Sequence, residues 1–355
     1  MRDLSKRMRE GNFRKPTNER AGIDFASNDY LGLSRSKELQ RRIFEELAGL
    51  ENVWGSTGSR LLTGNRRYAE ALEEEIARFH GYPAGVLFSC GYMANVGLLS
   101  AVAADQDTIL FDAQIHASTK DGIRLSRAQA YPFKHNDLDH LERRLKSCPA
   151  SGTRWICIDS VYSTDGSFAP LKEIVVLAQQ FSARLIVDEA HAVGVLGPHG
   201  RGLVAEESLT EQVFAQVVPF GKGPGVHGAI VLGSRMLQEM LWNFANAWIY
   251  TTALPKSSLA AIRMSYQMFP SMDAERRALE GLIKNFKKSL SPIQSVIIPG
   301  CERVKRKSQE LWEHGFDVRP LVSPTVQRGK ESLRICLHAF NTQEELHKLM
   351  EYLNG

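Results

Sequence analysis

The stretch Arg184-Leu-Ile-Val-Asp-Glu-Ala-His-Ala-Val-Gly194 has the pattern of an apolar β-strand that stops at acidic residues. In a doubly wound sheet the carboxyl ends of the strands face the ligand crevice, so we expect Asp188 at that edge. A carboxylate there can pair with a pyridinium nitrogen and keep it protonated, which makes the ring an electron sink. His191 is expected near the same place. The alternative is a strand-end Asp that caps the next turn, which is common.

Strand and helix patterns alternate on both sides of this stretch. Such alternation is typical of a mostly parallel sheet that is covered by helices on both faces. The expected strands are 85–88, 107–111, 155–158, 184–187, 213–219 and 229–232, and the expected helices are 92–104, 118–127 and 171–181.

The pattern changes near residue 240. We expect one long helix over 273–290, followed by shorter strands and helices. The sequence therefore predicts an N-terminal segment of residues 1–40, a large α/β domain of residues 41–240 and a smaller C-terminal α+β domain of residues 241–355. The N-terminal segment is expected to pack against the large domain.

Composition argues against several classes of protein. The formal net charge of +4 over 355 residues is too small to favour a nucleic-acid or membrane partner. No run approaches the ~20 apolar residues of a membrane span, and no apolar stretch follows the basic N-terminus, so no secretory signal is expected. The five cysteines lack metal-ligand spacing. They predict free thiols, no metal site and a cytoplasmic protein.

The segment Phe220-Gly-Lys-Gly-Pro-Gly225 holds one lysine among glycines, between two apolar strands. Glycine permits close backbone approach that other residues forbid. A partly desolvated lysine in such a loop is suited to imine formation. The segment lacks the Ser or Thr that follows the lysine of a nucleotide P-loop. By itself the loop is equally compatible with an exposed lysine in a Gly-rich hairpin.

Two further motifs lie at expected strand-to-helix junctions. In Ser89-Cys-Gly-Tyr-Met-Ala-Asn95, the free amides of Gly91 and Tyr92 at a helix N-terminus would form an anion site, with phosphate as the usual occupant. In Ile115-His-Ala-Ser-Thr-Lys-Asp-Gly122, His116 could stack on an aromatic cofactor. Each motif alone is weak, because many helices begin this way and a lone histidine is more often structural.

The order of these motifs resembles the aspartate-aminotransferase fold type of pyridoxal-5′-phosphate (PLP) enzymes and, more narrowly, the α-oxoamine synthase family. The resemblance covers nearly the whole chain. Its further motifs are Ser27-Asn-Asp-Tyr-Leu-Gly-Leu33, Gly55-Ser-Thr-Gly-Ser-Arg-Leu-Leu-Thr-Gly64, Tyr162-Ser-Thr-Asp-Gly166, Ala169-Pro-Leu171, Gly200-Arg-Gly202 and Leu333-Arg-Ile335.

This resemblance implies an α/β protein of PLP-dependent transferase fold type I, with a large sheet domain and a smaller C-terminal domain. It implies an acyltransferase that joins L-alanine to pimeloyl-CoA in biotin biosynthesis by a decarboxylative Claisen condensation. It also implies a homodimer with the active site at the subunit interface.

The resemblance assigns roles around the cofactor ring. Lys222 would carry PLP as a Schiff base and move the α-proton of the substrate. His116 would stack on the ring and orient the substrate, and Asp188 would pair with the ring nitrogen. His191 and Ser163 would contact the ring hydroxyl or its surroundings.

The resemblance also assigns residues that bind the cofactor phosphate. Gly91 and Tyr92 would hold the phosphate through their backbone, with Cys90 at a position where serine is common. Thr251 and Thr252 would reach the phosphate of the partner subunit's cofactor.

Asn28 and Arg334 would bind the carboxylate of the amino acid, a group that a guanidinium fork suits.

One departure from the family pattern concerns the phosphate. Pro219 stands where the family usually has Thr or Ser, and it offers neither a hydroxyl nor an amide hydrogen. The sequence therefore predicts looser cofactor binding or a substitute donor. Alternatives are a sister enzyme that uses glycine with acetyl-CoA or succinyl-CoA, or serine with a long acyl-CoA, and a non-catalytic protein of the same fold. An aminotransferase fits the motifs less well.

Overall fold

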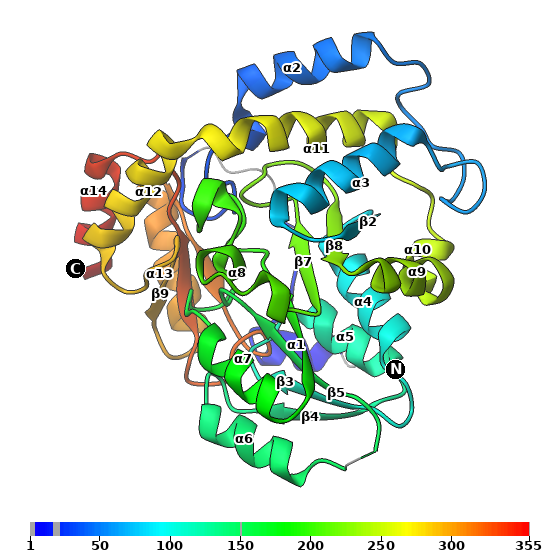
Figure 1. The fold of residues 1–355 in the computed structure, drawn as a ribbon. Coiled ribbons are helices and arrows are strands. Elements are labelled where there is room, and N and C mark those ends of the chain that lie inside the picture. Colours follow the sequence, from blue (N-terminus) through cyan, green and yellow to red (C-terminus); the bar gives the residue numbers. More distant parts are fainter. Residues whose placement is uncertain (1–3, 17–21, 150, 355) are drawn as a thin grey trace. The chain divides into compact units, whose positions relative to one another are not determined.

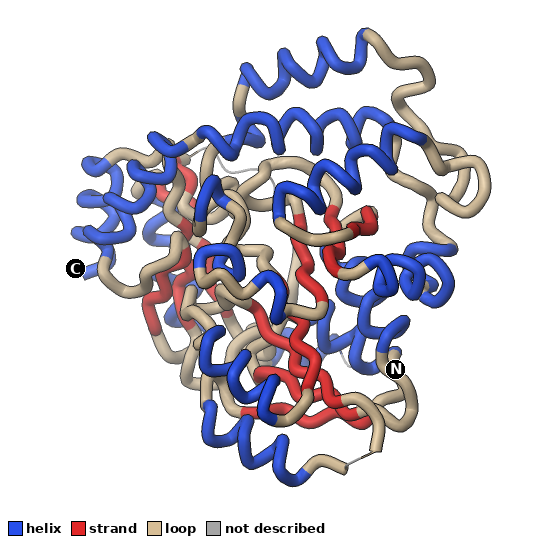
Figure 2. Tube along the Cα trace, viewed as in Figure 1, coloured by secondary structure: helices blue, strands red, loops and turns tan. Residues whose placement is uncertain are grey.

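The computed structural model describes residues 4–16, 22–149 and 151–354, and it divides into two compact units. The larger unit holds Leu31–Tyr162 and Phe168–Asp273. The smaller unit holds the described residues up to Tyr30, the segment Ser163–Ser167 and the described residues from Ala274 onward. Figure 2 shows the helices in blue and the strands in red along the chain.

The larger unit extends past the predicted boundary at residue 240 and ends at Asp273. The reason is α11 (Lys256–Met268), which packs against α2 (Lys37–Ala48) and α3 (Arg67–His80), the yellow, blue and cyan helices of Figure 1. Leu259 of α11 is buried in the same apolar cluster as residues of α3. Burial of this apolar face joins residues 256–268 to the larger unit.

A seven-stranded sheet forms the centre of the larger unit, with the strand order β2-β8-β7-β6-β5-β3-β4. The pairs from β7 to β4 are parallel, whereas β8 pairs antiparallel with both β2 and β7. The mostly parallel sheet predicted from the sequence is thus confirmed. The strands are β2 (Ala84–Phe88), β3 (Thr108–Asp112), β4 (Gln129–Phe133), β5 (Arg154–Asp159), β6 (Ala183–Asp188), β7 (Ala215–Pro219) and β8 (Ala229–Gly233).

Alternating side chains divide each central strand between two apolar layers, because successive residues of a strand point to opposite faces. On β5, Trp155 and Cys157 belong to one cluster, and Ile156 and Ile158 belong to another. Both layers are buried, so these strands are apolar throughout rather than alternating with polar residues.

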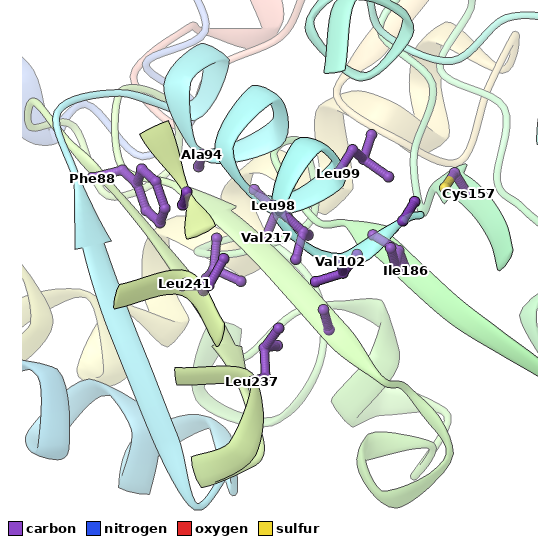
Figure 3. Packing of buried hydrophobic residues seen from close by; sticks show 14 of the residues in the cluster. Phe88, Ala94, Leu98, Leu99, Val102, Cys157, Ile186, Val217, Leu237 and Leu241 are labelled. Carbon is purple, nitrogen blue, oxygen red and sulfur yellow. The ribbon is translucent and has the colours of Figure 1, made fainter. Parts of the chain in front are cut away.

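Helices cover both layers. Figure 3 shows the first layer, in which Leu98 and Val102 of α4 and Leu237 and Leu241 of α9 pack around Val217 of the sheet. Residues of α6 and α7 contribute to the second layer. The remaining helices of this unit are α4 (Gly91–Val102), α5 (Ala117–Leu125), α6 (Leu138–Ser147), α7 (Leu171–Gln180), α8 (Leu203–Glu206), α9 (Arg235–Phe244) and α10 (Asn246–Ile249).

The smaller unit contains an antiparallel sheet in the order β11-β12-β9 and a separate parallel pair of β1 with β10. Because β1 pairs with β10, the described residues up to Tyr30 belong to the smaller unit together with the C-terminal part of the chain. The expected packing of residues 1–40 against the large domain stays a prediction. The strands are β1 (Ile23–Asp24), β9 (Ile293–Ile297), β10 (Phe316–Asp317), β11 (Arg319–Leu321) and β12 (Ser332–Cys336). The helices are α1 (Leu4–Arg9), α12 (Asp273–Phe286), α13 (Cys301–Glu313) and α14 (Gln343–Asn354).

The helix expected over 273–290 ends at Phe286, because Lys287 adopts a left-handed φ of 63°. Among the described residues, no helix combines the length and the apolar character needed to cross a membrane.

Candidate active site

Asp188 is the last residue of β6 and is 6% exposed. Its Oδ1 accepts a hydrogen bond from the Ala190 amide at 2.9 Å, as in a strand-end turn. Its Oδ2 accepts a second one from Asn95 Nδ2 at 2.7 Å. These two donors fix the orientation of the carboxylate, and each oxygen retains a lone pair for a further donor.

His116 is linked to Asp188 through two intermediate side chains. The His116 Nδ1 accepts the Ser118 amide at 3.3 Å and lies 2.7 Å from Ser118 Oγ, which accepts a hydrogen bond from Asn95 Nδ2 at 3.0 Å. Since Nδ1 accepts, a neutral ring carries its proton on Nε2. Burial lowers the pKa of His116, the Asp188 charge opposes this, and the Lys222 charge adds to it. The ring is therefore held neutral.

Lys222 is half-buried in a tight turn after β7. The Gly225 amide donates to the Lys222 carbonyl at 2.8 Å. A Cβ on Gly223 would lie 2.2 Å from the Val193 carbonyl oxygen, and one on Gly194 would lie 3.0 Å from Gly223. The glycines thus allow the lysine turn to touch the loop that follows Asp188, which is the close approach that the sequence pattern predicted.

Asp159 is a buried carboxyl group in this region that the sequence analysis did not single out. It ends β5 directly beside Asp188 in the parallel register. Burial raises the pKa of Asp159 well above its ordinary value, the negative charge of Asp188 adds to this, and the Lys222 charge opposes it. Burial and the neighbouring charge of Asp188 thus favour the neutral form of Asp159.

The predicted anion site lies at the start of α4. The helix begins at Gly91, and the side chain of its N-cap residue, Cys90, makes no capping hydrogen bond. A Cβ on Gly91 would lie 2.6 Å from Pro219 Cγ, so the ring of Pro219 packs on this turn. Tyr92 is partly exposed and donates from its hydroxyl to Asp121. The free N–H groups of the first turn suit a phosphate.

The predicted phosphate threonines lie after α10. Thr251 Oγ1 donates to the Ala247 carbonyl at 2.8 Å, and Thr252 forms an antiparallel bridge with Ser59. Both threonines line one pocket together with Ser89, which directly precedes the N-cap of α4.

The predicted carboxylate-binding residues meet within the smaller unit. Arg334 Nη2 donates to Asn28 Oδ1 at 2.9 Å, and Arg334 Nε donates to the Ser163 carbonyl at 2.6 Å. Arg334 Nη1 lies 2.9 Å from Cys336 Sγ. Tyr30 donates to Asn28 Oδ1 at 3.2 Å. A guanidinium has five N–H donors, so these three contacts fix its orientation without exhausting it.

The structure thus brings predicted residues together in two groups. His116, Asp188 and Lys222 interact within the larger unit, and Asn28, Ser163 and Arg334 interact within the smaller one. The buried His191 follows Asp188 in the larger unit. The predicted roles of all these residues toward a ligand stay predictions.

Three neighbours of the site were missed. Asn95 lies one helical turn after Gly91 and therefore on the same face of α4, a spacing that could have revealed it. Asp159 ends an apolar strand as Asp188 does, so the same strand-end argument applies to it. Nothing in the local pattern distinguishes Ser118 from other residues near a helix start.

Comparison with known proteins decides the family. The family model of aminotransferase class I and II matches residues 20–353. The chain belongs to this family. It is 39% identical to the 8-amino-7-oxononanoate synthase of Emericella nidulans, over 93% of this chain and 88% of that protein. It is 36% identical to the enzyme of the same name from Methylobacillus flagellatus, over 94% and 86%.

Solved structures agree with this result. A serine palmitoyltransferase variant from S. paucimobilis, with a bound PLP–myriocin aldimine, matches with a TM-score of 0.86 and 28% identity over 93% of this chain and 86% of that one. The 8-amino-7-oxononanoate synthase of Francisella tularensis matches with a TM-score of 0.80 and 31% identity over 94% and 96%. The predicted fold type I and the predicted resemblance to the α-oxoamine synthases are thereby confirmed.

Proposed function

We propose that this protein is a PLP-dependent acyltransferase that condenses L-alanine with pimeloyl-CoA, giving 8-amino-7-oxononanoate, CoA and CO2 in biotin biosynthesis. The observation that carries the proposal is the match to 8-amino-7-oxononanoate synthases at 36–39% identity over more than nine-tenths of the chain.

The side chains of the larger unit fit PLP. An amine, a buried carboxylate held by two donors and a helix N-terminus match the aldehyde, the ring nitrogen and the phosphate of this cofactor. When bound, PLP supplies an electron sink for the electrons released at the substrate Cα. Asp188 would hold the proton of the ring nitrogen, and the Asn95 hydrogen bond would fix the angle of the carboxylate.

Lys222 would hold the cofactor before the substrate arrives and then accept the Cα proton at Nζ. The neutral His116 would offer the N–H of Nε2 to the substrate or the thioester oxygen, because its Nδ1 is engaged by Ser118. In the proposed reaction the new C–C bond forms at the alanine Cα as the thioester loses CoA. The condensed product then loses its carboxylate as CO2, and a proton is added back at Cα.

The residues of the smaller unit fit the amino-acid substrate. Arg334 is oriented by Asn28, Cys336 and the Ser163 carbonyl, and its remaining N–H groups can form a bidentate pair with a carboxylate. We propose this role for Arg334 and Asn28.

A homodimer in the cytoplasm is part of the proposal. Large apolar side chains are exposed on the two segments that the Ser59–Thr252 bridge joins, with Trp54 76%, Leu62 79% and Tyr250 80% exposed. Burial in a subunit interface would remove this apolar surface from water.

The second candidate is a serine palmitoyltransferase type of reaction, because a structure of that enzyme superposes with the higher TM-score of 0.86. Glycine-using sister reactions differ from both candidates in the amino acid. A protein without catalytic activity is the third reading, and Pro219 is the feature that favours it.

The experiment is a visible absorption spectrum of the purified protein with added PLP, followed by separate titrations with L-alanine, glycine and L-serine. We expect a band of lysine-linked cofactor that is lost in Lys222→Ala and kept in the surface control Lys172→Ala. A response to L-alanine, and release of 8-amino-7-oxononanoate and CO2 with pimeloyl-CoA, would support the proposal. A response to serine or glycine alone would indicate a sister enzyme, and the absence of any band would favour a non-catalytic protein.

A further inference from the structure

The orientation of the Asn28 amide is fixed by two donors. Arg334 Nη2 and the Tyr30 hydroxyl both donate to Asn28 Oδ1, at 2.9 and 3.2 Å. Because a guanidinium can only donate, the amide oxygen must face it. The donating Nδ2 of Asn28 is therefore the end that can add to the guanidinium donors around an anionic ligand. How well Asn28 presents this N–H group to a ligand depends on how rigidly its backbone is held.

A tight polar turn precedes Asn28. Asp24 Oδ1 accepts hydrogen bonds from the amides of Ala26 and Ser27 at 3.0 and 2.9 Å. Asp24 Oδ2 accepts one from Ser27 Oγ at 2.7 Å. Ser27, the residue next to Asn28, is thus bound to Asp24 through both its backbone and its side chain.

His338, which is fully buried, holds the same serine from the other side. Its Nε2 lies 3.0 Å from the Ser27 carbonyl oxygen and 3.1 Å from Ser27 Oγ. Its Nδ1 lies 2.9 Å from Asn341 Oδ1, and Asn341 Nδ2 donates to the Asp24 carbonyl at 3.2 Å. The contacts form a closed ring through four residues, and Phe340 stacks on the imidazole with ring centroids 4.6 Å apart.

The electrostatics of Asp24 agree with this geometry. Burial of the carboxyl would raise its pKa, but the Ser27 amide, the charge of His338, the Ala26 amide and the Ser27 hydroxyl together lower the pKa to about 2. Asp24 therefore stays ionised at neutral pH and keeps accepting all three hydrogen bonds.

We propose that Asp24, Ser27 and His338 are positioning residues for the amino-acid substrate, because they hold Asn28 in place beside Arg334. The inference rests on the proposed function, since it takes the ligand of Arg334 and Asn28 to be the carboxylate of an amino acid. Ser27, Asp24 and His338 act through Asn28 and need not touch the substrate.

The test compares steady-state kinetics of Ser27→Ala with wild type in the PLP-loaded enzyme. We expect the KM for L-alanine to rise about tenfold, on the order of one lost hydrogen bond, while kcat stays within about twofold and the KM for pimeloyl-CoA is unchanged. Ser27→Thr keeps a hydroxyl and is expected to restore most of the affinity.

The control is Ser308→Ala, which removes a buried serine hydroxyl elsewhere in the smaller unit, one that donates to the Val318 carbonyl at 2.7 Å. The proposal would be overturned if Ser27→Ala and Ser308→Ala had the same KM for L-alanine, or if Ser27→Ala lowered kcat alone. If Ser27→Ala does not fold by thermal unfolding, Asp24→Asn replaces it, since the amide keeps the size of the side chain and removes the charge.

Failure of the proposed function gives a different result. If wild type responds to glycine or L-serine and not to L-alanine, the assigned substrate is wrong. The same variants are then compared with that amino acid, because all three share the carboxylate on which the positioning residues act. A selective rise in its KM would still support the positioning role, and an unchanged KM would refute it.

Discussion

Asn95 of α4 donates a 2.7 Å hydrogen bond to the carboxylate of Asp188 at the end of β6. The same amide nitrogen donates to Ser118, which contacts the ring of His116. One helical side chain therefore holds both the carboxylate and the imidazole that the family resemblance assigns to the cofactor ring. The geometry makes Asn95 a support for two groups at once.

Replacement of Asn95 by Ala is expected to weaken PLP binding and to lower kcat by roughly tenfold or more, because a hydrogen bond to a charged group contributes about 1.5–3 kcal/mol. Asn95→Asp should be worse, since it adds a second negative charge beside Asp188. Cofactor titration and steady-state kinetics measure both effects. Asn243→Ala is the control, because this exposed amide donates to the Glu239 carbonyl of its own helix. Wild-type affinity in Asn95→Ala would contradict the supporting role.

Pro219→Thr is expected to tighten PLP binding. Pro219 packs on Gly91 at the start of α4, where a threonine hydroxyl could donate to the phosphate. A hydrogen bond to a charged group contributes about 1.5–3 kcal/mol, so the Kd for PLP should fall by about tenfold or more. The measurement is a cofactor titration of the apoprotein, with the exposed Pro198→Thr as a matched control. If Pro219→Thr binds PLP no more tightly than that control, then Pro219 does not weaken cofactor binding.

Arg334→Lys should raise the KM for the amino acid by about tenfold or more and leave the KM for the acyl-CoA unchanged. Lysine keeps the positive charge but loses the planar fork that reaches Asn28, Cys336 and the Ser163 carbonyl. Arg319→Lys on the neighbouring strand serves as the control. Equal kinetics in the two variants would exclude bidentate recognition by Arg334.

His80 is expected to make the fold less stable in mild acid. Burial, together with the charge of Arg201, lowers the pKa of His80 from 6.5 to about 3. Below pH 6.5, His80 binds a proton in the unfolded chain but not in the folded chain. The free energy of unfolding therefore falls as the pH drops from 6.5 toward 3. The loss approaches ~1.4 kcal/mol per pH unit.

Urea unfolding between pH 6.5 and 4.5 tests this expectation. His80→Gln retains a polar group that can face Tyr266, whose hydroxyl lies 3.1 Å from His80 Nε2. The variant should lose about 2 kcal/mol less than wild type over this range. His347→Gln, at an exposed position, should behave as wild type does. Parallel pH profiles for wild type and His80→Gln would refute the assignment.

The sequence was sufficient where one physical signal dominates. Apolar runs identified β6 and β7, because burial on both faces requires apolar residues throughout. The glycines around Lys222 identified the lysine turn, because close backbone contact requires glycine. The edge strand β4 (Gln129–Phe133) was missed, since Phe133 alone among its five residues is buried, and it contains a proline and lies at the end of the sheet beside β3.

The rest of the site depends on long-range geometry. Asn95 and Asp188 are 93 positions apart, and Arg334 and Asn28 are 306 apart. The family resemblance supplied Asn28 and Arg334, but no local pattern shows that the Asn95 amide reaches Asp188. The limit of the larger unit at Asp273 was also missed, because the packing of α11 on α2 and α3 joins segments more than 150 residues apart.

The contact between Gly223 and Val193 has a consequence for protein engineering. The lysine turn and the loop after Asp188 meet with no room for a side chain, since a Cβ on Gly223 would lie 2.2 Å from the Val193 carbonyl. Libraries that randomise one loop alone will therefore select glycine again at the contact. Grafting a different substrate preference onto this scaffold would require transplanting residues 193–202 and 220–228 as a single cassette.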